Sequence, residues 1–385
     1  MSTLKITDDL KEQIQIGREM ISLYDENKRN FVMHQYDNEP IWGGYDSKED
    51  MMYKGIYDYF VYGLTLEQQI YYHLQYAKHE EKKEYLTIQN EFLYKARLNT
   101  KKDFYLLEDK WEAYKMLKPY YKREMIKITG ENDFNIFKDF ISRHPKFIVK
   151  PLGLSNTKGV KVVDSDEYED KKVLFRSFIN IGEDYKYDYI VYGGIVEGTV
   201  LEELVEQDSA FGIMNPGSIN AVRIPTVRVN GKVIPYGCWF KIGVTNELVV
   251  GECRDAVMAG IDPDTGTLYT DAITEKGVQH EKHPVSGITF KGFQVPKWGE
   301  LRSMIDEVAS QLKPTINHVG WDVVLTPDKG WAIIEGNYWG QIFKQLVEQK
   351  GLAREFGDLI GWHMDEGKFW WQYKISQIEK SAGLR

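Results

Sequence analysis

The sequence predicts an α+β protein in which a mainly helical N-terminal region precedes a part built on β-sheets. Up to about residue 100, apolar residues recur at helical spacing among Tyr, Glu, Lys and Gln. From Phe147 onward, short runs rich in β-branched residues alternate with Gly, Asn and Asp, which is typical of strands and turns. Helical spacing returns near the C-terminus and at Leu301, Ile305, Val308 and Leu312, so we expect helices to cover the sheets.

Two sequence signals place individual elements within this outline. In the helical region, Thr65 followed by Gln68 has the form of a capping box, which predicts that a helix begins at Leu66. In the sheet-bearing part, Asn230-Gly231 lies between two apolar runs and predicts a two-residue hairpin, because both turn positions need positive φ.

The composition limits the classes of partner. Of 385 residues, 42% are hydrophobic and 28% charged, which is enough for a large core. The formal net charge of −9 disfavours binding to nucleic acid or to an anionic membrane. With only Cys238 and Cys253, we expect no disulfide framework and no zinc site. No apolar run approaches the roughly 18 residues of a membrane span, so we expect a soluble, cytoplasmic protein.

A glycine-bearing loop follows a strand that carries a lysine. Phe147–Pro151 predicts this strand, which contains Lys150. Two glycines would let the loop backbone approach a ligand, and the polar side chains between them would donate to phosphate oxygens. These loop residues are Gly153, Ser155, Asn156, Thr157 and Gly159. The loop lacks the GxxxxGK[ST] pattern of a P-loop, so an ordinary hairpin loop with Lys158 as a solvated charge is the alternative.

The most informative segment is a predicted hairpin between Trp321 and Asn337. Two apolar runs flank Pro327–Gly330, which has the composition of a tight turn. A turn centred between residues 328 and 329 would oppose three pairs of residues across the strands: Thr326 with Trp331, Val324 with Ile333, and Asp322 with Glu335.

The third pair of this hairpin brings two acids together. Directly opposed residues have Cβ atoms about 4.5–5.5 Å apart, and like charges at that separation are destabilising. Asn337 returns to the same face two residues after Glu335. A divalent cation would relieve the repulsion between Asp322 and Glu335, and oxygen ligands favour magnesium over zinc. A loop one residue longer or shorter would instead move the two carboxylates apart.

Several motifs occur in a specific order along the chain. They are Asp109-Lys110, FIVKP ending at Pro151, the loop to Gly159, LEELVEQ from Leu201, NAVRI from Asn220, IDPDTG from Ile261, HPVSG from His283, VPKW from Val295, and GWDVVLTPDKGWAIIEGN from Gly320. In this order they resemble the ATP-grasp superfamily, and more narrowly its sugar-transfer-associated group, which is similar to proteins of teichuronopeptide and capsule biosynthesis. The resemblance begins around Tyr62 and runs nearly to the C-terminus.

The resemblance implies an ATP-grasp fold, in which two α+β subdomains sandwich the nucleotide. We expect a helical region at 1–100, an N-terminal subdomain with the phosphate loop at 101–205, and a C-terminal subdomain with the metal site at 206–385. Lys110 and Lys150 would contact the α- and β-phosphates. The other implied ATP contacts are Gly153, Ser155, Asn156, Lys158 and Gly159 over the triphosphate, and Glu202, Glu203, Leu204 and Val205 beside the adenine.

The resemblance also implies the metal ligands. Asp322, Glu335 and Asn337 would hold two magnesium ions, and their spacing of 13 and then 2 residues matches the family pattern. Position 320 departs from that pattern, because related ligases often carry an arginine there that stabilises the transferring phosphoryl group, whereas this chain has Gly.

Four residues are candidates for roles in catalysis. Arg223 is the replacement for the missing arginine, with Lys241 and Arg254 behind it, and each has an ordinary ion-pair role as the alternative. His283 would bind substrate or act as a base, and a structural role before a glycine turn is its alternative.

The activity implied by the resemblance is the ATP-dependent ligation of a carboxylate to an amine through an acyl phosphate. The partners would be small molecules, for example a sugar acid and an amino acid used in cell-surface polysaccharide or capsule biosynthesis. A sugar or polyol kinase on the same fold is a second hypothesis, which needs a base such as His283 or Asp255. A nucleotide-binding scaffold without chemistry is a third, disfavoured because all three metal ligands are present. The sequence makes no prediction of oligomeric state.

Overall fold

The computed structural model describes residues 4–37, 39–154, 159–179, 181, 198–245, 256–274, 276–338, 340 and 342–384. The chain divides into two units. We call residues 1–100, 275–278 and 343–385 the helical unit, and residues 101–274 and 279–342 the sheet unit. Residues 343–385, which we expected to end the C-terminal subdomain, therefore group with the first 100 residues.

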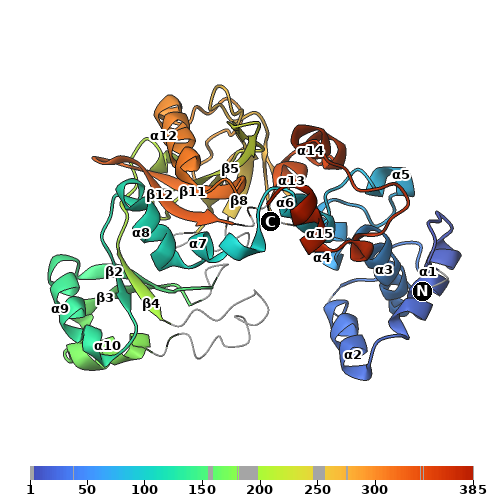
Figure 1. Ribbon diagram of the computed structural model, residues 1–385, viewed down its shortest axis with the longest axis horizontal. Coiled ribbons are helices and arrows are strands. Elements are labelled where there is room, and N and C mark those ends of the chain that lie inside the picture. Colours follow the sequence, from blue (N-terminus) through green and yellow to red (C-terminus); the bar gives the residue numbers. More distant parts are fainter. Residues whose placement is uncertain are drawn as a thin grey trace. The chain divides into compact units, whose positions relative to one another are not determined.

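The helical unit is built from short helices (Figure 1). They are α1 (Leu10–Ile21), α2 (Glu26–Gln35), α3 (Lys48–Tyr62), α4 (Leu66–Tyr71), α5 (His79–Lys82), α6 (Ile88–Ala96), α13 (Lys344–Glu348), α14 (Ala353–Ile360), the 3-10 helix η6 (Trp370–Gln372) and α15 (Ile375–Ser381). Thr65 caps α4 by accepting a hydrogen bond from the Gln68 backbone N–H, as the sequence predicts, and Asp9, Ser47 and Thr87 cap other helices in the same way.

Close packing onto α3 holds this unit together. Gly17 of α1 approaches α3 so closely that a Cβ at this position would lie 1.8 Å from the Tyr53 carbonyl oxygen. The C-terminal segment is fastened to the end of the same helix, because the indole N–H groups of Trp370 and Trp371 donate to the carbonyls of Tyr59 and Phe60. These bonds explain why the C-terminal residues group with the N-terminal helices.

One carboxylate is buried between two lysines in the helical unit. Asp58 accepts from Lys54 at 2.5 Å and from Lys82 at 2.8 Å, and all three side chains are buried. Burial lowers the pKa of Lys54 to about 8, against the opposing effect of the Asp58 charge. The shared carboxylate is therefore the counter-ion that makes two buried ammonium groups tolerable.

The first part of the sheet unit contains a four-stranded antiparallel sheet in the order β1-β4-β2-β3. Its strands are β1 (Met125–Ile128), β2 (Lys146–Pro151), β3 (Lys161–Asp164) and β4 (Thr199–Glu203). Helices α9 (Phe134–Arg143) and α10 (Lys171–Ile179) share one apolar core with these strands. The chain enters the sheet from η1 (Lys101–Asp103), α7 (Tyr105–Glu108) and α8 (Lys110–Tyr121).

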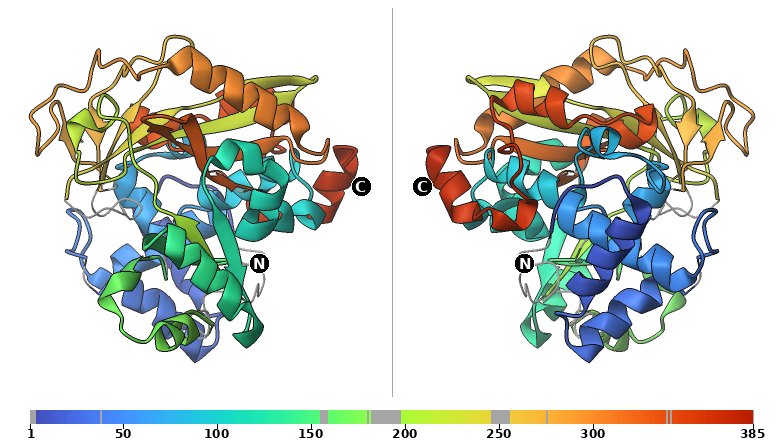
Figure 2. Two further views of the ribbon diagram at one scale, coloured as in Figure 1. Left: turned by 90° about the vertical axis from the view of Figure 1, so that its left-hand side faces the viewer. Right: turned by 90° about the vertical axis from the view of Figure 1, so that its right-hand side faces the viewer.

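The second part contains an eight-stranded sheet in the order β10-β9-β8-β7-β5-β11-β12, with β6 paired to β5. The strands are β5 (Ala221–Val229), β6 (Lys232–Pro235), β7 (Trp239–Gly243), β8 (Ala256–Gly260), β9 (Ala272–Ile273), β10 (Gln279–His280), β11 (His318–Thr326) and β12 (Gly330–Asn337). The predicted hairpin at Asn230-Gly231 joins β5 to β6, with φ of 50° and 77°. The long helix α12 (Trp298–Gln311) runs along one face of this sheet (Figure 2).

In the part of the chain that the structure describes, no helix combines the length and the apolar character needed to cross a membrane.

Candidate active site

The hairpin of β11 and β12 brings the two predicted acids together. Asp322 lies directly opposite Glu335, as the sequence analysis expected. Nearer the turn the predicted register is wrong by one residue, since the observed pairs are Val324–Ala332 and Thr326–Gly330 in place of Val324–Ile333 and Thr326–Trp331.

The hairpin differs from the predicted one in two places, each by one residue, and the two differences cancel at Asp322 and Glu335. The loop contains the three residues Pro327–Lys329 and is followed by Gly330 at φ 68°, a left-handed conformation that glycine adopts without strain. Further along β12, a β-bulge inserts Ile334 as an extra residue. The bulge restores the opposition of Asp322 and Glu335 that the longer loop would have removed.

Four charged residues lie on one face of the eight-stranded sheet, one on each of four neighbouring strands. Arg223 of β5 is the direct partner of Asp322, which in turn opposes Glu335. Lys241 of β7 opposes Ala221, two residues before Arg223, and therefore shares the same face. The row runs from two cations on β7 and β5 to two carboxylates on β11 and β12.

Arg223 is tied to the first of these carboxylates. Its Nε and Nη2 donate to Asp322 Oδ1 and Oδ2 at 2.6 and 2.9 Å, and the guanidinium lies over the Trp239 ring. A Cβ at Gly320 would lie 2.8 Å from Arg223 Nη1. A larger residue at position 320 would therefore collide with the Arg223 guanidinium where it is observed. Glycine at this position leaves the space that the guanidinium occupies.

The two acids differ in electrostatic environment. Burial raises the pKa of Asp322 to about 6, although the Arg223 charge opposes this rise. Burial acts in the same direction on Glu335, but the charges of Lys110, Lys150 and Arg223 outweigh it and lower the pKa of that carboxyl. Glu335 is thus the better-stabilised anion of the pair.

The side-chain oxygens at this hairpin are the kind of ligand that a hard divalent cation prefers. Asn337 Nδ2 lies 3.2 Å from Asp322 Oδ2 and 3.4 Å from Glu335 Oε1, so three oxygen-bearing side chains converge. Among the described residues, no group of three or more His, Cys, Asp or Glu side chains is arranged to hold a metal by itself. A cation here would need further oxygen ligands from phosphate or water, which suits Mg²⁺.

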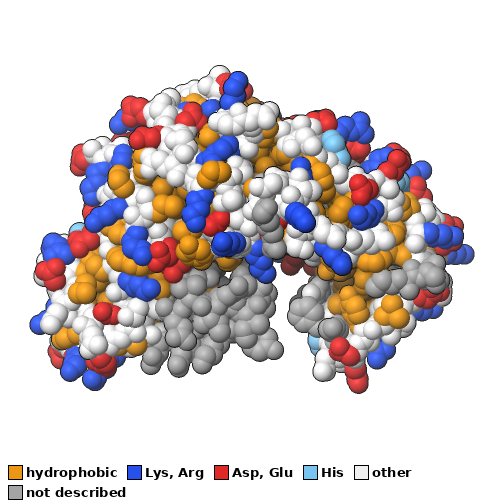
Figure 3. Space-filling view, viewed as in Figure 1, with side chains coloured by type: hydrophobic (Ala, Val, Ile, Leu, Met, Phe, Trp, Pro, Cys, Tyr) orange, Lys and Arg blue, Asp and Glu red, His pale blue; other side chains and the backbone are white. Residues whose placement is uncertain are grey.

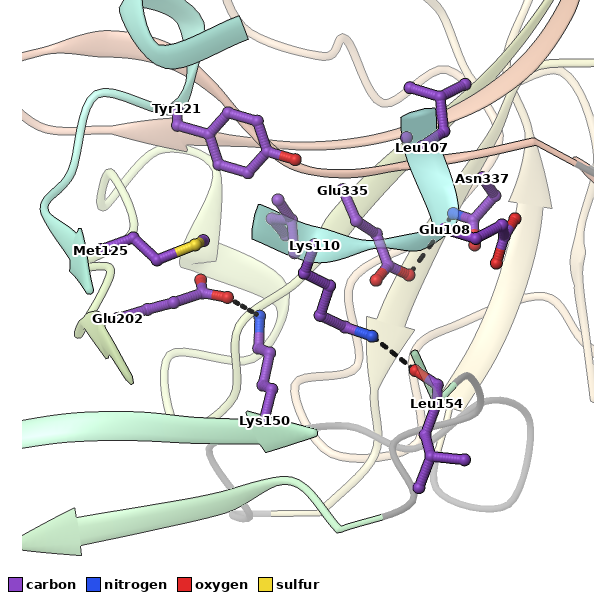
Figure 4. A pocket seen from close by; sticks show the side chains of 12 residues that line it. Leu107, Glu108, Lys110, Tyr121, Met125, Lys150, Leu154, Glu202, Glu335 and Asn337 are labelled. Carbon is purple, nitrogen blue, oxygen red and sulfur yellow. Dashed lines mark hydrogen bonds and ion pairs between the residues drawn. The ribbon is translucent and has the colours of Figure 1, made fainter. Parts of the chain in front are cut away.

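Beside the hairpin is a narrow, charged pocket (Figure 4). It is lined by Leu107, Glu108, Lys110, Tyr121, Met125, Lys150, Leu154, Glu202, Ile334, Glu335, Gly336 and Asn337. Lys110 Nζ donates to the Leu154 carbonyl at 2.5 Å, and Lys150 Nζ pairs with Glu202 Oε1 at 3.0 Å. The free volume is about 20 Å³, little more than one water molecule needs. A phosphate chain would enter only if both lysines exchange these partners for phosphate oxygens.

A second pocket of about 250 Å³ borders the first at Tyr121. Glu203, the last residue of β4, and the two residues after it, Leu204 and Val205, line one part of it. Pro327, Asp328 and Lys329 of the hairpin loop line another. Of the ATP contacts predicted from the sequence, Lys110, Lys150 and Glu202 line the first pocket, and Glu203, Leu204 and Val205 line the second.

Comparison with known proteins assigns the chain to a family. The sequence model of the sugar-transfer associated ATP-grasp family matches residues 89–358. The chain belongs to this family. Its sheet unit accordingly has the ATP-grasp fold, and the helices of residues 1–100 precede this unit in the sequence. The comparison with curated proteins gives no match.

Solved ATP-grasp structures are similar to this chain only at low identity. The ligase PsnB with a phosphomimetic precursor variant, Mg and ADP is 10% identical (TM-score 0.38), over 69% of this chain and 60% of its own. A ligase from Chryseobacterium gregarium associated with ribosomal peptides is 16% identical (TM-score 0.36), over 69% and 62%. D-alanyl-alanine synthetase A from Vibrio cholerae is 12% identical (TM-score 0.36), over 73% and 66%. This chain spans 60–66% of the length of these three structures.

Sequence reasoning missed two charged residues that line these pockets, Glu108 in the first and Arg123 in the second. Glu108 is half-buried, accepts the Tyr338 backbone N–H at 3.0 Å, and has a pKa that desolvation raises to about 7. Arg123 is buried and pairs with Glu202. Glu108 directly precedes the Asp109-Lys110 motif, which offered a positional signal. Nothing in the sequence around Arg123 distinguishes it from a surface arginine.

Other predicted residues lie apart from the two pockets or outside the described residues. His283 is buried, its Nε2 lies 3.0 Å from the Gly243 carbonyl, and its Nδ1 accepts from the Ser286 backbone N–H. This bonding favours the structural alternative. Gly153 and Gly159 lie on either side of residues 155–158 in the sequence, with Gly159 at φ 71°. The predicted residues outside the described part are Ser155, Asn156, Thr157, Lys158, Arg254 and Asp255.

Proposed function

We propose that the protein is an ATP-dependent carboxylate–amine ligase that acts through an acyl-phosphate intermediate. The observation that carries this proposal is that Asp322 lies opposite Glu335, and that Glu335 lines a pocket together with Lys110 and Lys150. Opposed carboxylates suit a metal, and paired lysines suit a phosphate chain. Together they form the charge pattern needed to bind and activate a nucleoside triphosphate.

We assign the cation to the hairpin. Asp322, Glu335 and Asn337 would hold two Mg²⁺ ions, and bound there the metal would neutralise charge on the phosphate oxygens. Arg223 is paired with Asp322, the first of the two opposed carboxylates, through its Nε and Nη2. We propose that it stabilises the transferring phosphoryl group, a role that position 320 cannot fill in this chain.

We assign the nucleotide to the two adjoining pockets. Lys110 and Lys150 would contact the α- and β-phosphates after leaving Leu154 and Glu202. The adenine would lie in the larger pocket beside Glu203, Leu204 and Val205, where the backbone beyond β4 can read its edge. The subdomains that hold it would be residues 101–205 and the part of the sheet unit that follows.

A carboxylate does not react directly with an amine, because the oxygen that would have to leave the acyl carbon is a poor leaving group. Phosphorylation of the carboxylate supplies a better one. A substrate carboxylate oxygen attacks the γ-phosphorus in line, the bond to the β-phosphate oxygen breaks, and ADP leaves. An amine then attacks the acyl carbon, phosphate departs, and an amide remains after loss of the amine proton. Lys110, Lys150 and Arg223 supply positive charge where the phosphoryl oxygens need it. Exclusion of water protects the acyl phosphate from hydrolysis.

The substrates that we propose are small molecules, with a sugar acid as the carboxylate and an amino acid or other amine as the acceptor. The sugar-transfer context of the family supports a place in cell-surface polysaccharide or capsule biosynthesis, with the reaction in the cytoplasm. Nucleic acid is not an expected partner: on the face in Figure 3, Lys and Arg are interspersed with Asp and Glu among the described residues. This agrees with the net charge of −9.

A kinase that phosphorylates a hydroxyl group would use the same nucleotide contacts but needs a general base. His283, one candidate for that base, has both ring nitrogens engaged within the fold. This observation favours the ligase, in which the attacking carboxylate is already an anion.

The test is a screen of sugar acids against amino acids and simple amines, with ADP release as the readout and mass spectrometry of the product. We expect ADP release that depends on both substrates and a product whose mass is that of the two joined with loss of water. A stable phosphate ester formed without any amine would support the kinase instead. Tight nucleotide binding without turnover across the panel would support the scaffold.

A further inference from the structure

Arg123 connects the two sheets of the sheet unit through a network that the sequence did not predict. Its guanidinium contacts Glu202 on β4 twice, from Nε at 2.9 Å and from Nη2 at 2.7 Å. It also donates to three backbone carbonyls, those of Tyr121 at 3.1 Å, Ile333 at 2.5 Å and Ile334 at 3.0 Å. Four of these contacts are hydrogen bonds and the Nη2–Glu202 contact is an ion pair, so all three guanidinium nitrogens are engaged.

Two of these carbonyls belong to the β-bulge of β12. Ile334 is the extra residue of the bulge, and Ile333 precedes it. A bulge interrupts the ladder of hydrogen bonds, and among the described residues β12 is the last strand of its sheet, with no strand beyond it to accept from. Arg123 supplies donors at this place. Arg123 therefore stabilises the β-bulge at Ile334, and this bulge puts Glu335 opposite Asp322.

The other end of the network reaches the phosphate side of the pocket. Glu202 is shared between Arg123 and Lys150, so the position of the Lys150 ammonium depends on the carboxylate that Arg123 holds. Glu335 follows Ile334 by one peptide bond. A single buried guanidinium thus lies between a candidate phosphate lysine and a candidate metal ligand.

We propose that Arg123 is a positioning residue that fixes Glu335 relative to Lys150 by joining the bulge of β12 to Glu202 of β4. The inference rests on the proposed function, because it matters only if Lys150 binds phosphate and Glu335 binds metal. Arg123 would touch neither ligand. It would set the distance between the two places where the nucleotide–metal complex is held.

The test compares Arg123→Lys with Arg123→Gln in the full-length chain. A lysine keeps the charge beside Glu202 but has a single ammonium group, which cannot also reach both bulge carbonyls. A glutamine loses the charge as well. Arg228→Lys is the matched control, since Arg228 lies on β5, donates to the carbonyls of Ala309, Leu312 and Lys313, and lines neither pocket.

The measurement is calorimetric binding of the non-hydrolysable ATP analogue AMP-PNP, with and without Mn²⁺. For Arg123→Lys we expect affinity without metal to stay within about threefold of wild type, whereas the gain produced by Mn²⁺ falls at least tenfold, about 1.4 kcal/mol. Arg123→Gln should lose both, and Arg228→Lys should lose neither. A variant that only destabilises the fold would not lower the gain from Mn²⁺ while leaving the metal-free affinity unchanged.

Two results would overturn the inference. One is a folded Arg123→Lys protein whose gain from Mn²⁺ stays within threefold of wild type. The other is failure of both Arg123 variants to fold while Arg228→Lys folds, because Arg123 would then be a requirement of the fold. Absence of AMP-PNP binding by the wild-type chain would instead refute the proposed function, so the two failures are distinguishable.

Discussion

Glu202→Gln tests the electrostatics of the pocket most sharply. The Glu202 side chain is buried between Lys150 at 3.0 Å and Arg123 at 2.7 Å. Burial alone would raise the pKa of this carboxyl. The charges and hydrogen bonds of the two cations outweigh burial and lower the pKa from 4.5 to about 2.

The sign of the pH dependence follows from this lowered pKa. Because the folded-state pKa lies below the unfolded one, the ionised carboxylate stabilises the fold above pH 4.5, and this contribution is lost as the pH falls toward 2. The difference between 4.5 and about 2 corresponds to about 3 kcal/mol at pH 7. About 2 kcal/mol of it should be gone at pH 3. Glutamine removes the pH-dependent contribution and leaves two buried cations without their anion.

The assay is urea unfolding of the wild-type and Glu202→Gln chains at pH 7 and pH 3. We expect the variant to be less stable by about 3–5 kcal/mol at pH 7, and the gap to shrink by about 2 kcal/mol at pH 3. Glu203→Gln is the control, because its half-exposed carboxylate pairs with Lys329 at the surface and should contribute no more than about 1 kcal/mol. A gap of equal size at both pH values would refute the reasoning.

Four further predictions address the site and the helical unit. Asp322→Asn or Glu335→Gln should lower Mg²⁺-dependent ADP release at least about 100-fold while the circular dichroism spectrum is retained; unchanged release would mean that the carboxylates are misassigned. Lys150→Ala should weaken AMP-PNP binding about tenfold or more, and an unaltered dissociation constant would remove it from the site. Arg223→Ala should lower kcat more than ATP affinity, whereas a pure affinity loss would assign it to binding. Asp58→Asn should destabilise the chain to urea by about 3–5 kcal/mol, because it leaves two lysines buried without an anion, and a loss below about 1 kcal/mol would contradict this.

The parts of the fold that follow from local chemistry could be predicted from the sequence. Thr65 caps α4 because a hydroxyl satisfies a free backbone N–H, and Asn230-Gly231 turns a hairpin because both residues tolerate positive φ. The opposition of Asp322 and Glu335 was also predicted, although through a register that is wrong near the turn. The bulge at Ile334 has no signature in the sequence, since it depends on what lies beside the strand edge.

Residues whose role depends on tertiary neighbours could not be predicted. Arg123 and Glu108 are ordinary charged residues in the sequence, and only folding places one between two sheets and the other beside Glu335. Arg223 was a candidate among several cations, and the space at Gly320 explains how its guanidinium fits. His283 shows the reverse case, a residue of catalytic type whose ring nitrogens are used within the fold.

The central claim is that the acids opposed across β11 and β12 bind the metal that accompanies ATP. Its most direct test is a crystal structure of the chain with AMP-PNP and Mn²⁺, in which the anomalous signal locates the metal. The account predicts manganese bound by oxygens of Asp322, Glu335 and Asn337 and by phosphate, with Lys150 moved from Glu202 to a phosphate oxygen. Manganese bound elsewhere, with Asp322 still paired to Arg223 and phosphate absent from the pocket, would contradict it.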